Sequence, residues 1–312
     1  MAYATAGGYG NLSQGNFSPI IYSKNAQLKF RKVNVAQAVT NTEYAGEIAN
    51  MGDTVNIIVE PTIVVSSYAR GQGIDVQDLD DTQKQLVVDQ GNYYGFAIDD
   101  VERKHAHHNW EGMASDEAGY RLRDAFDSNL FTFMNSNVAA ARTTGSTSTP
   151  LKVNHGGTYT LGTEVTPTLA LARQARILDE GNVPMENRWA VVNPFFVELL
   201  RNDSSTLIND DYTSKGALHN GLVTAKPIHG FKLYVSNNLP STGDGPSATS
   251  GTNYGSCFAG HISAIATAEH IKTAEKIRAE RTFADVIRGL HIFGRSLLRT
   301  EALTSFIYNN GT

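Results

Sequence analysis

A single apolar stripe of helical period runs from Ser115 to about Ala141 and sets the scale of the fold. Its members recur every three or four residues on one helix face: Ala118, Leu122, Ala125, Phe126, Leu130, Phe133, Met134 and Val138. Asp116 and Glu117 stand in the first turn, where carboxylates interact favourably with the helix dipole. A helix of this length spans about 40 Å, which is long for a globular domain and suits a structural beam.

The segment before this helix combines negative charge with strand-like alternation. Residues 43–102 carry 12 acidic and 2 basic side chains, a charge of -10. Apolar residues alternate at period two in three runs: Val55, Ile57 and Val59; Leu86 and Val88; Tyr94, Phe96 and Ile98. A turn-prone stretch at 66–73 separates the first run from the others. We predict an extended hairpin that is marginal in water by itself and lies on a neighbouring subunit; the plain alternative is a solvated acidic face.

The remaining elements indicate a mixed α+β chain. A second helix is predicted for 167–180, where Gly181 supplies the C-terminal cap and Pro184 follows. Residues 189–192 have the composition of a buried strand, and a short helix is predicted to begin after Asn193. Two stretches rich in Gly, Ser and Thr, 143–160 and 241–255, are predicted to be loops.

Charge content excludes several classes of protein. Charged residues make up only 18% of the chain, against about 25% in an average soluble protein. A surface that neighbouring subunits cover needs fewer charges, although β-rich monomers share this composition. The net charge of -5 argues against a dedicated nucleic-acid binder, which usually has a basic domain. No apolar run approaches the ~20 residues of a membrane helix.

Few residues are arranged for metal binding. His105, His107 and His108 form a cluster with metal-ligand chemistry, but a zinc site needs a fuller ligand set and ordered supporting hydrogen bonds. We predict a polar turn here, with no metal and no cofactor. A metal-dependent hydrolase that uses these histidines is the remote enzyme alternative.

Other reactive residues are better explained by structure than by catalysis. Asp99, Asp100 and Glu102 lack the apolar surroundings that raise an acid's pKa, so we predict helix caps and salt bridges. Cys257 is the single cysteine and sits among small residues, which favours a buried apolar thiol. No dinucleotide, phosphate-loop or serine-hydrolase motif occurs. These absences together favour a structural protein.

Six groups of sequence strings follow one another through most of the chain. They lie at 17–24, at 44–48 with 52–55, at 89–100, at 111–141, at 178–194, and at 288–291 with 299–303. The more specific ones include Arg188-Trp189-Ala190-Val191-Val192-Asn193-Pro194. In this order they resemble the major capsid proteins of tailed bacteriophages, which have the Johnson fold. Encapsulin nanocompartments share that fold but lack a close match to the opening string.

The resemblance implies an α+β Johnson-type capsid fold in five segments. These are an N-terminal arm (1–42), an extended β-hairpin loop (43–104), a peripheral domain (105–185) with a spine helix (111–141), an axial domain (186–282), and a return to the peripheral domain (283–312). It implies no enzyme. The chain is expected to form pentamers and hexamers of an icosahedral head around double-stranded DNA in the virion, after assembly in the bacterial cytoplasm. An encapsulin-like shell and a phage decoration or receptor-binding protein remain the alternatives.

Two sets of charged residues are predicted to serve such a shell. Loop residues are expected to contact a neighbouring copy: Arg70, Asp78, Asp80, Asp81 and Lys84. A basic arm is expected to face the interior, with too few cations for tight DNA binding: Lys24, Lys29, Arg31 and Lys32. About 16 residues precede Phe17, too few for an internal scaffolding domain. We therefore expect a separate scaffolding protein, with a portal protein and a cement or decoration protein as further partners.

Overall fold

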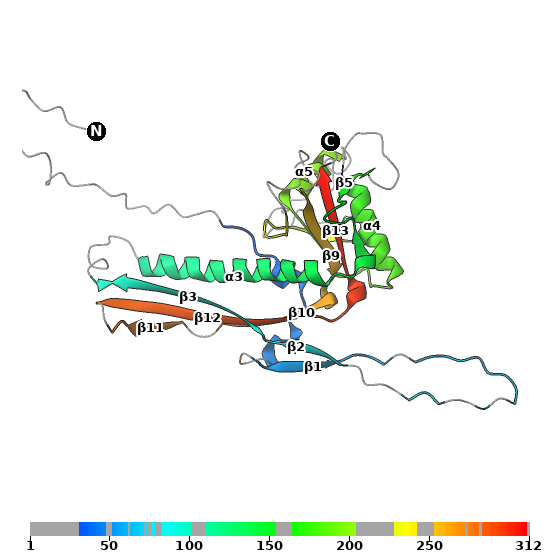
Figure 1. The fold of residues 1–312 in the computed structure, drawn as a ribbon, viewed down its shortest axis with the longest axis horizontal. Coiled ribbons are helices and arrows are strands. Elements are labelled where there is room, and N and C mark those ends of the chain that lie inside the picture. Colours follow the sequence, from blue (N-terminus) through cyan, green and yellow to red (C-terminus); the bar gives the residue numbers. More distant parts are fainter. Residues whose placement is uncertain are drawn as a thin grey trace, which may run out of the picture.

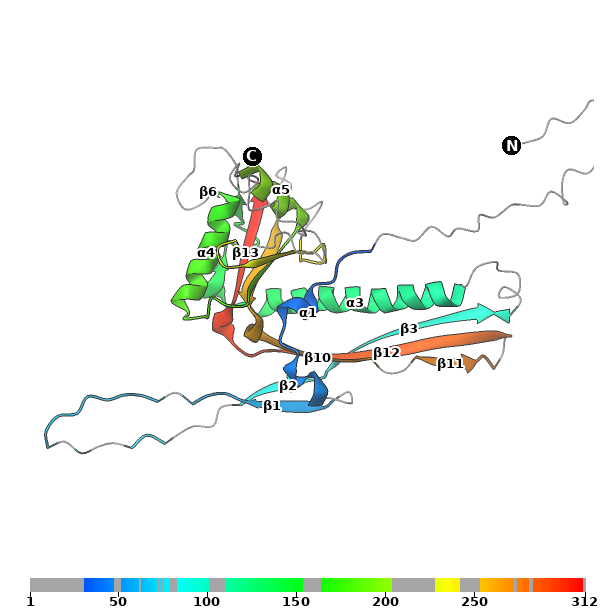
Figure 2. The same ribbon diagram turned by 180° about the vertical axis from the view of Figure 1, so that it is seen from behind.

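The computed structural model describes residues 31–47, 52–61, 63–71, 73, 76–78, 83–100, 110–153, 164–203, 228–241, 253–271, 274–280 and 283–310. These residues form a long lobe, a compact lobe at one end of it, and a projecting hairpin (Figures 1 and 2). The hairpin leaves the junction of the two lobes and points away from the far end of the long lobe. No helix in the described ranges is long and apolar enough to cross a membrane.

The long lobe is one helix lying along a four-stranded sheet. The helix, α3 (Trp110–Asn137), has 28 residues, and its stripe is buried at Leu122, Phe126, Leu130 and Met134, which confirms the predicted helix. In the sheet, β12 (Ala284–Leu297) pairs with three antiparallel strands: β3 (Gln90–Asp99), β10 (Ile265–Ile271) and β11 (Glu275–Arg278). The Phe126 ring meets the Phe293 ring of β12 edge to face, with centroids 5.1 Å apart.

The compact lobe is built on a seven-stranded mixed sheet. Its order is β6-β5-β13-β9-β7-β8, with β4 also paired to β13. The strands are β4 (Thr143–Thr144), β5 (Leu151–Val153), β6 (Glu164–Val165), β7 (Arg188–Val192), β8 (Lys232–Val235), β9 (Gly255–His261) and β13 (Leu303–Asn310). Two helices supply residues to the apolar cluster on one face, α4 (Pro167–Glu180) and α5 (Pro194–Asp203).

The two helices and the buried strand predicted for this lobe are confirmed, whereas the stretch 143–160, predicted to be a loop, contains the short strands β4 and β5. Helix α4 begins where the Thr166 hydroxyl accepts a hydrogen bond from the Leu169 amide, and it ends at Gly181. Every residue of β7 is buried because both faces of the sheet are covered. Ala190 and Val192 join the cluster beneath α4 and α5, whereas Trp189 and Val191 join a second cluster shared with α3.

The hairpin differs from the predicted one in its return strand. It consists of β1 (Thr54–Ile58) and β2 (Gln83–Val87), paired antiparallel. The described residues between them, which we call the projecting loop (59–61, 63–71, 73 and 76–78), form no helix or strand. The segment 89–100, predicted to return along the hairpin, contains β3 and pairs with β12. Alternation identifies a strand but not its partner.

The two lobes also group the chain differently from the predicted segments. Residues 143–185 and 303–310 supply β4, β5, β6, α4 and β13 to the compact lobe, whereas 265–278 supply β10 and β11 to the long one. The chain passes between the lobes at three short helical turns, η2 (Ala140–Arg142), η3 (Ile262–Ala264) and η4 (Thr300–Ala302). Further turns are α1 (Ala36–Val39) and η1 (Glu43–Glu47). Because sheet partners are far apart in sequence, contiguous segments do not coincide with lobes.

Candidate assembly surfaces

The projecting loop exposes apolar side chains. Five of them are at least two-thirds exposed, with Val65 at 93% and Val76 at 91%; the others are Ile63, Val64 and Tyr68. A soluble protein seldom leaves such a group uncovered unless it binds another molecule. This surface was not predicted from the sequence, although the run Ile63-Val64-Val65 between Pro61 and Ser66 was a usable signal.

The charged residues predicted for this loop are only partly brought together. Arg70 and Asp78 are exposed on it. Lys84 lies instead in β2, where its Nζ donates a hydrogen bond to the Leu297 carbonyl at 3.3 Å. Asp80 and Asp81 lie outside the described residues.

A groove of about 630 Å³ lies at the base of the hairpin. Apolar side chains of β1 and of the segment after β12 line it, among them Ile57, Ile58 and Leu298. Its charged lining is mixed: Glu43, Glu60, Glu301, Lys84 and Arg299. The groove therefore has no single electrostatic character that would select one kind of ligand.

The sheet of the long lobe has a second exposed apolar face. His291 packs against Phe126 of α3, so the preceding residue, Leu290, points away from the helix. Its register partner on β3 is Tyr93, which is 83% exposed. Ile277 on β11 is also exposed. Together with Leu290 they leave apolar area on the outer side of the sheet.

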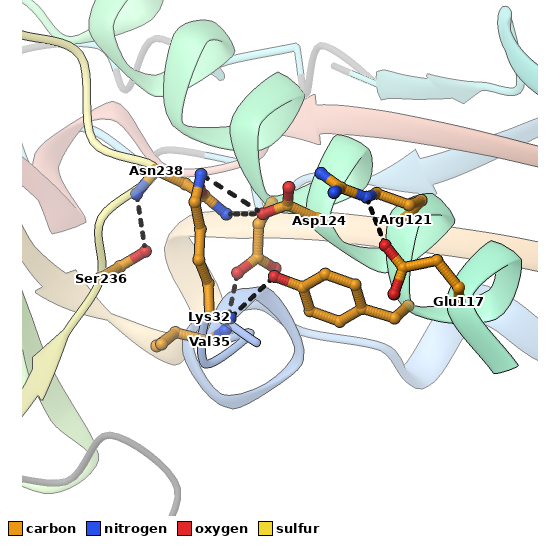
Figure 3. Close-up of polar contacts among 9 residues, drawn as sticks. Lys32, Val35, Glu117, Arg121, Asp124, Ser236 and Asn238 are labelled. Atoms are coloured by element: carbon orange, nitrogen blue, oxygen red, sulfur yellow. Dashed lines mark hydrogen bonds and ion pairs between the residues drawn. The ribbon is translucent and has the colours of Figure 1, made fainter. Parts of the chain in front are cut away.

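Residues 31–40, the arm base, lie against α3. The Arg31 guanidinium lies 5.3 Å from the ring centroid of Tyr120 and 3.9 Å from the Glu117 carboxylate. The Lys32 ammonium donates to Asn238 Oδ1 at 2.7 Å and lies 3.8 Å from Asp124 Oδ1 (Figure 3). Two of the four cations predicted to face the interior are thus paired within the chain. The other two, Lys24 and Lys29, lie outside the described residues.

A buried carboxylate holds the start of α1. Asp127 is 1% exposed, and its two oxygens accept hydrogen bonds from the Val35 amide at 2.8 Å and the Ala36 amide at 3.1 Å. Burial raises the pKa of Asp127 to about 6, although these two hydrogen bonds lower it. Asp127 of α3 therefore supplies acceptors to two backbone amides of the arm base.

Residues with catalytic chemistry are not arranged as a reaction site in the described part of the chain. His105, His107, His108 and Glu102 lie outside it, and no three described His, Cys, Asp or Glu side chains form a metal-binding group. Asp100 pairs with Arg278, as the predicted salt bridge requires. Cys257 is fully buried, and burial raises the pKa of its thiol far above the ordinary value, which suppresses the thiolate.

Solved capsid structures have the same fold. A structure from Mycobacterium phage Che8 is 24% identical with a TM-score of 0.70, over 94% of this chain and 98% of that one. The capsid of the cyanophage P-SCSP1u is 19% identical (TM-score 0.65, 95% and 94% covered). The mature capsid of bacteriophage PhiM1 is 15% identical (TM-score 0.64, 99% and 100% covered). These likenesses establish the fold. No curated protein matches the chain.

A family model described as phage capsid protein matches residues 60–304. The matched range begins in the projecting loop and ends at the start of β13. It includes α3 and most of the sheets of the long and compact lobes. Nothing in the comparisons favours a decoration protein, a receptor-binding protein or a metal-dependent hydrolase. The chain therefore belongs to the phage capsid protein family, and it is a structural major capsid protein with the Johnson fold.

Proposed function

We propose that copies of this chain form pentamers and hexamers that tile an icosahedral head around double-stranded DNA. The observation that carries the proposal is the family match over 60–304. A subunit of this kind works by contact with its neighbours, so its functional residues are those that its own fold leaves uncovered. The two exposed apolar surfaces described above meet that requirement.

The projecting loop and the outer face of the long sheet are proposed to meet between copies. Within one chain the loop extends away from the long lobe, so neither surface covers the other (Figure 1). Burying one large apolar side chain contributes about 1.5–3 kcal/mol, and the loop offers Ile63, Val64 and Val65 in sequence. A head-to-tail contact of this kind generates a ring when the rotation between neighbouring copies closes. Arg70 and Asp78 would then select the register of the contact rather than supply its affinity.

The two lobes are proposed to correspond to the axial and peripheral domains of the family. The compact lobe is assigned to the axial domain at the centre of each capsomer, and the long lobe to the peripheral domain. The observed strands support a grouping in which 143–203 and 303–310 join the axial domain, while 265–278 join the peripheral one.

Further partners are proposed from the charge of the arm. Lys24 and Lys29 remain the candidates for contact with the interior, because Arg31 and Lys32 are paired with α3. A separate scaffolding protein, then packaged DNA held by weak contacts, would occupy that interior. A portal protein and a cement or decoration protein would complete the head, which would assemble in the host cytoplasm.

Negative-stain electron microscopy of the purified chain tests the proposal. We expect aberrant shells, tubes or free capsomers when the chain is expressed alone. Small globular particles at every concentration would overturn assembly by this chain. Uniform shells of one size would support assembly by this chain and would contradict the need for a separate scaffolding protein.

A further inference from the structure

One long strand in the sheet of the long lobe has a partner on one side only. β3 has ten residues and pairs with β12 along its whole length. Within the described ranges no strand lies on its other side, which we call the free edge of β3. The edge strands of the other sheets are shorter: β6 has two residues, β8 has four, and β1 and β2 have five each. An unpaired edge presents a row of N–H and C=O groups that another extended segment can bond.

The free edge of β3 lacks the usual protection against such pairing. Proteins block edge strands with charged residues or proline. β11, on the opposite side of β12, follows this rule, because three of its four residues are charged: Glu275, Lys276 and Arg278. Residues 90–98 of β3 contain neither a charge nor a proline. The free edge is therefore open to a further strand.

Apolar side chains lie on both faces of β3 beside this edge. Tyr93 is 83% exposed on the outer face, where its register partner is Leu290. The next residue, Tyr94, points to the α3 side because successive side chains of a strand alternate. Its ring stacks on that of Phe96, with centroids 6.3 Å apart, and both residues remain partly exposed. A strand added at this edge would find apolar neighbours on each of its two faces.

The projecting loop contains a segment with the matching pattern. Ile63, Val64 and Val65 are consecutive, exposed and β-branched, the residue type that favours strands. A segment laid flat on the outer face of the sheet would bury only every second side chain. Consecutive apolar residues are instead typical of strands that are covered on both faces. The run therefore suits an edge better than a face.

The distribution of charge agrees with this pairing. Residues 63–69 carry no charge, like residues 90–98, and Arg70 follows them directly. β3 has an acidic residue at each end, Asp89 just before it and Asp99 as its last residue. When the apolar run lies opposite the middle of β3, Arg70 comes near one of these two acids whichever way the added strand runs.

We propose that the run Ile63-Val64-Val65 of one copy adds to the free edge of β3 in a neighbouring copy, as a further strand of its long-lobe sheet. The inference rests on the contact between loop and long lobe proposed above and states how that contact is made. Backbone hydrogen bonds join the loop to β3, and apolar side chains on both faces give the contact its specificity.

Disulfide crosslinking in assembled particles tests strand addition. Each chain combines one loop cysteine, at Val64 or Val65, with one cysteine on β3. The β3 positions are Tyr93→Cys and Gly95→Cys on the outer face, and Asn92→Cys and Tyr94→Cys on the α3 side. Neighbouring strands lie about 4.8 Å apart, within the Cα separation of roughly 4.4–6.8 Å that a disulfide needs.

Two features of the chain make this experiment specific. Leu290→Cys is the matched control, because it lies on the outer face but on β12, roughly 10 Å from an added strand. Native Cys257 is fully buried and does not compete for oxidation. A cysteine at Gly95 meets no atom within 4 Å, so the fold tolerates it.

We expect the two loop positions to crosslink to opposite faces of β3. One of Val64→Cys and Val65→Cys should pair with an outer-face position, and the other with a position on the α3 side. The chain should then shift from monomer to covalent multimers on non-reducing gels and return to monomer on reduction. Chains that carry Leu290→Cys should stay monomeric on the same gels.

Crosslinks of both loop positions to the outer face, or to Leu290→Cys, would show that the loop lies flat on the sheet. That result would overturn strand addition and keep the contact between loop and long lobe. Particles without any of these crosslinks would also overturn it.

Hydrogen exchange decides if the cysteine chains do not fold or if the parent forms no particles, a result that would contradict the proposed assembly itself. A peptide of residues 60–70 is added to the unassembled, full-length chain, with the same peptide carrying Ser at 63, 64 and 65 as the control. Slower exchange of the β3 amides with the first peptide alone supports strand addition, and equal exchange with both peptides overturns it.

Discussion

The arm base and the projecting loop both depart from the body of the molecule, but they meet their surroundings in opposite ways. The arm base buries its apolar residues in the cluster that α3 shares with the compact lobe, and it pairs Arg31 and Lys32 with α3. The projecting loop leaves Ile63, Val65 and Tyr68 uncovered. Exposed ion pairs contribute only about 0–1 kcal/mol each, whereas apolar burial contributes more. Unburied apolar area is therefore the better guide to which segment binds a neighbour.

The largest effect should come from the loop. Replacing Ile63, Val64 and Val65 together by Ser removes apolar area that is already exposed in the single chain. We expect assembly to be lost at concentrations where the parent forms particles, because several kcal/mol of apolar burial disappear from each contact. Sedimentation and electron microscopy measure this loss.

The stability of the unassembled triple variant is the control. Its free energy of unfolding should lie within about 0.5 kcal/mol of the parent value, as for other surface substitutions. Normal particle formation by this variant would show that the loop is not the surface that binds a neighbour.

Removing the carboxylate beneath the arm base should have the next largest effect. Asp127→Ala leaves the Val35 and Ala36 amides buried without an acceptor, which costs about 1–3 kcal/mol for each unsatisfied group. We expect urea unfolding of the unassembled chain to show a loss of about 2–4 kcal/mol. Asp127→Asn keeps one acceptor and should recover part of it. Equal stability of Asp127→Ala and the parent would mean that the arm base is not held in this way.

The same carboxyl group should make stability depend on pH. Burial, aided by the nearby charges of Asp124 and Glu269, raises the pKa of Asp127 from 3.8 to about 6. A raised folded-state pKa stabilises the fold fully below pH 3.8, and this contribution is lost as the pH rises through 6. Between pH 5 and pH 7 the parent should lose about 1 kcal/mol relative to Asp127→Asn. A constant difference between these pH values would contradict the raised pKa.

The smallest effect should come from the acidic side of the loop. Replacing Asp78, Asp80 and Asp81 by Asn should weaken assembly by a few tenths of a kcal/mol per contact, and only at low salt. Light scattering at low and high salt measures it against the parent. If this variant assembles as poorly as the variant of Ile63, Val64 and Val65, the acidic residues contribute at least as much to the contact as the apolar residues do.

Local elements could be predicted from the sequence because their signals are local. The stripe of Leu122, Phe126 and Leu130 identified α3, and Gly181 marked the end of α4. Partners could not be predicted in this way. Tyr94 and Phe96 alternate as a strand should, yet the partner strand, β12, lies some 190 residues later. A pattern confined to one segment carries no record of the segment that will pair with it.

The candidate surfaces illustrate the same limit. Lys32 was recognised as a cation, but its contact with Asn238 spans 206 residues and has no local signature. The loop was recognised by its charge, although its apolar run is what remains exposed. Exposure depends on what the rest of the chain covers, so residue type alone could not distinguish these two segments.

The position of β13 in the compact lobe has a consequence for synthesis. β13 lies between β5 and β9 and is the last strand of that sheet to leave the ribosome. Until then β5 and β9 lack their shared partner, and pairing over such sequence separations is slow. A nascent chain therefore cannot present a finished compact lobe to its neighbours, which delays polymerisation until translation has passed residue 310.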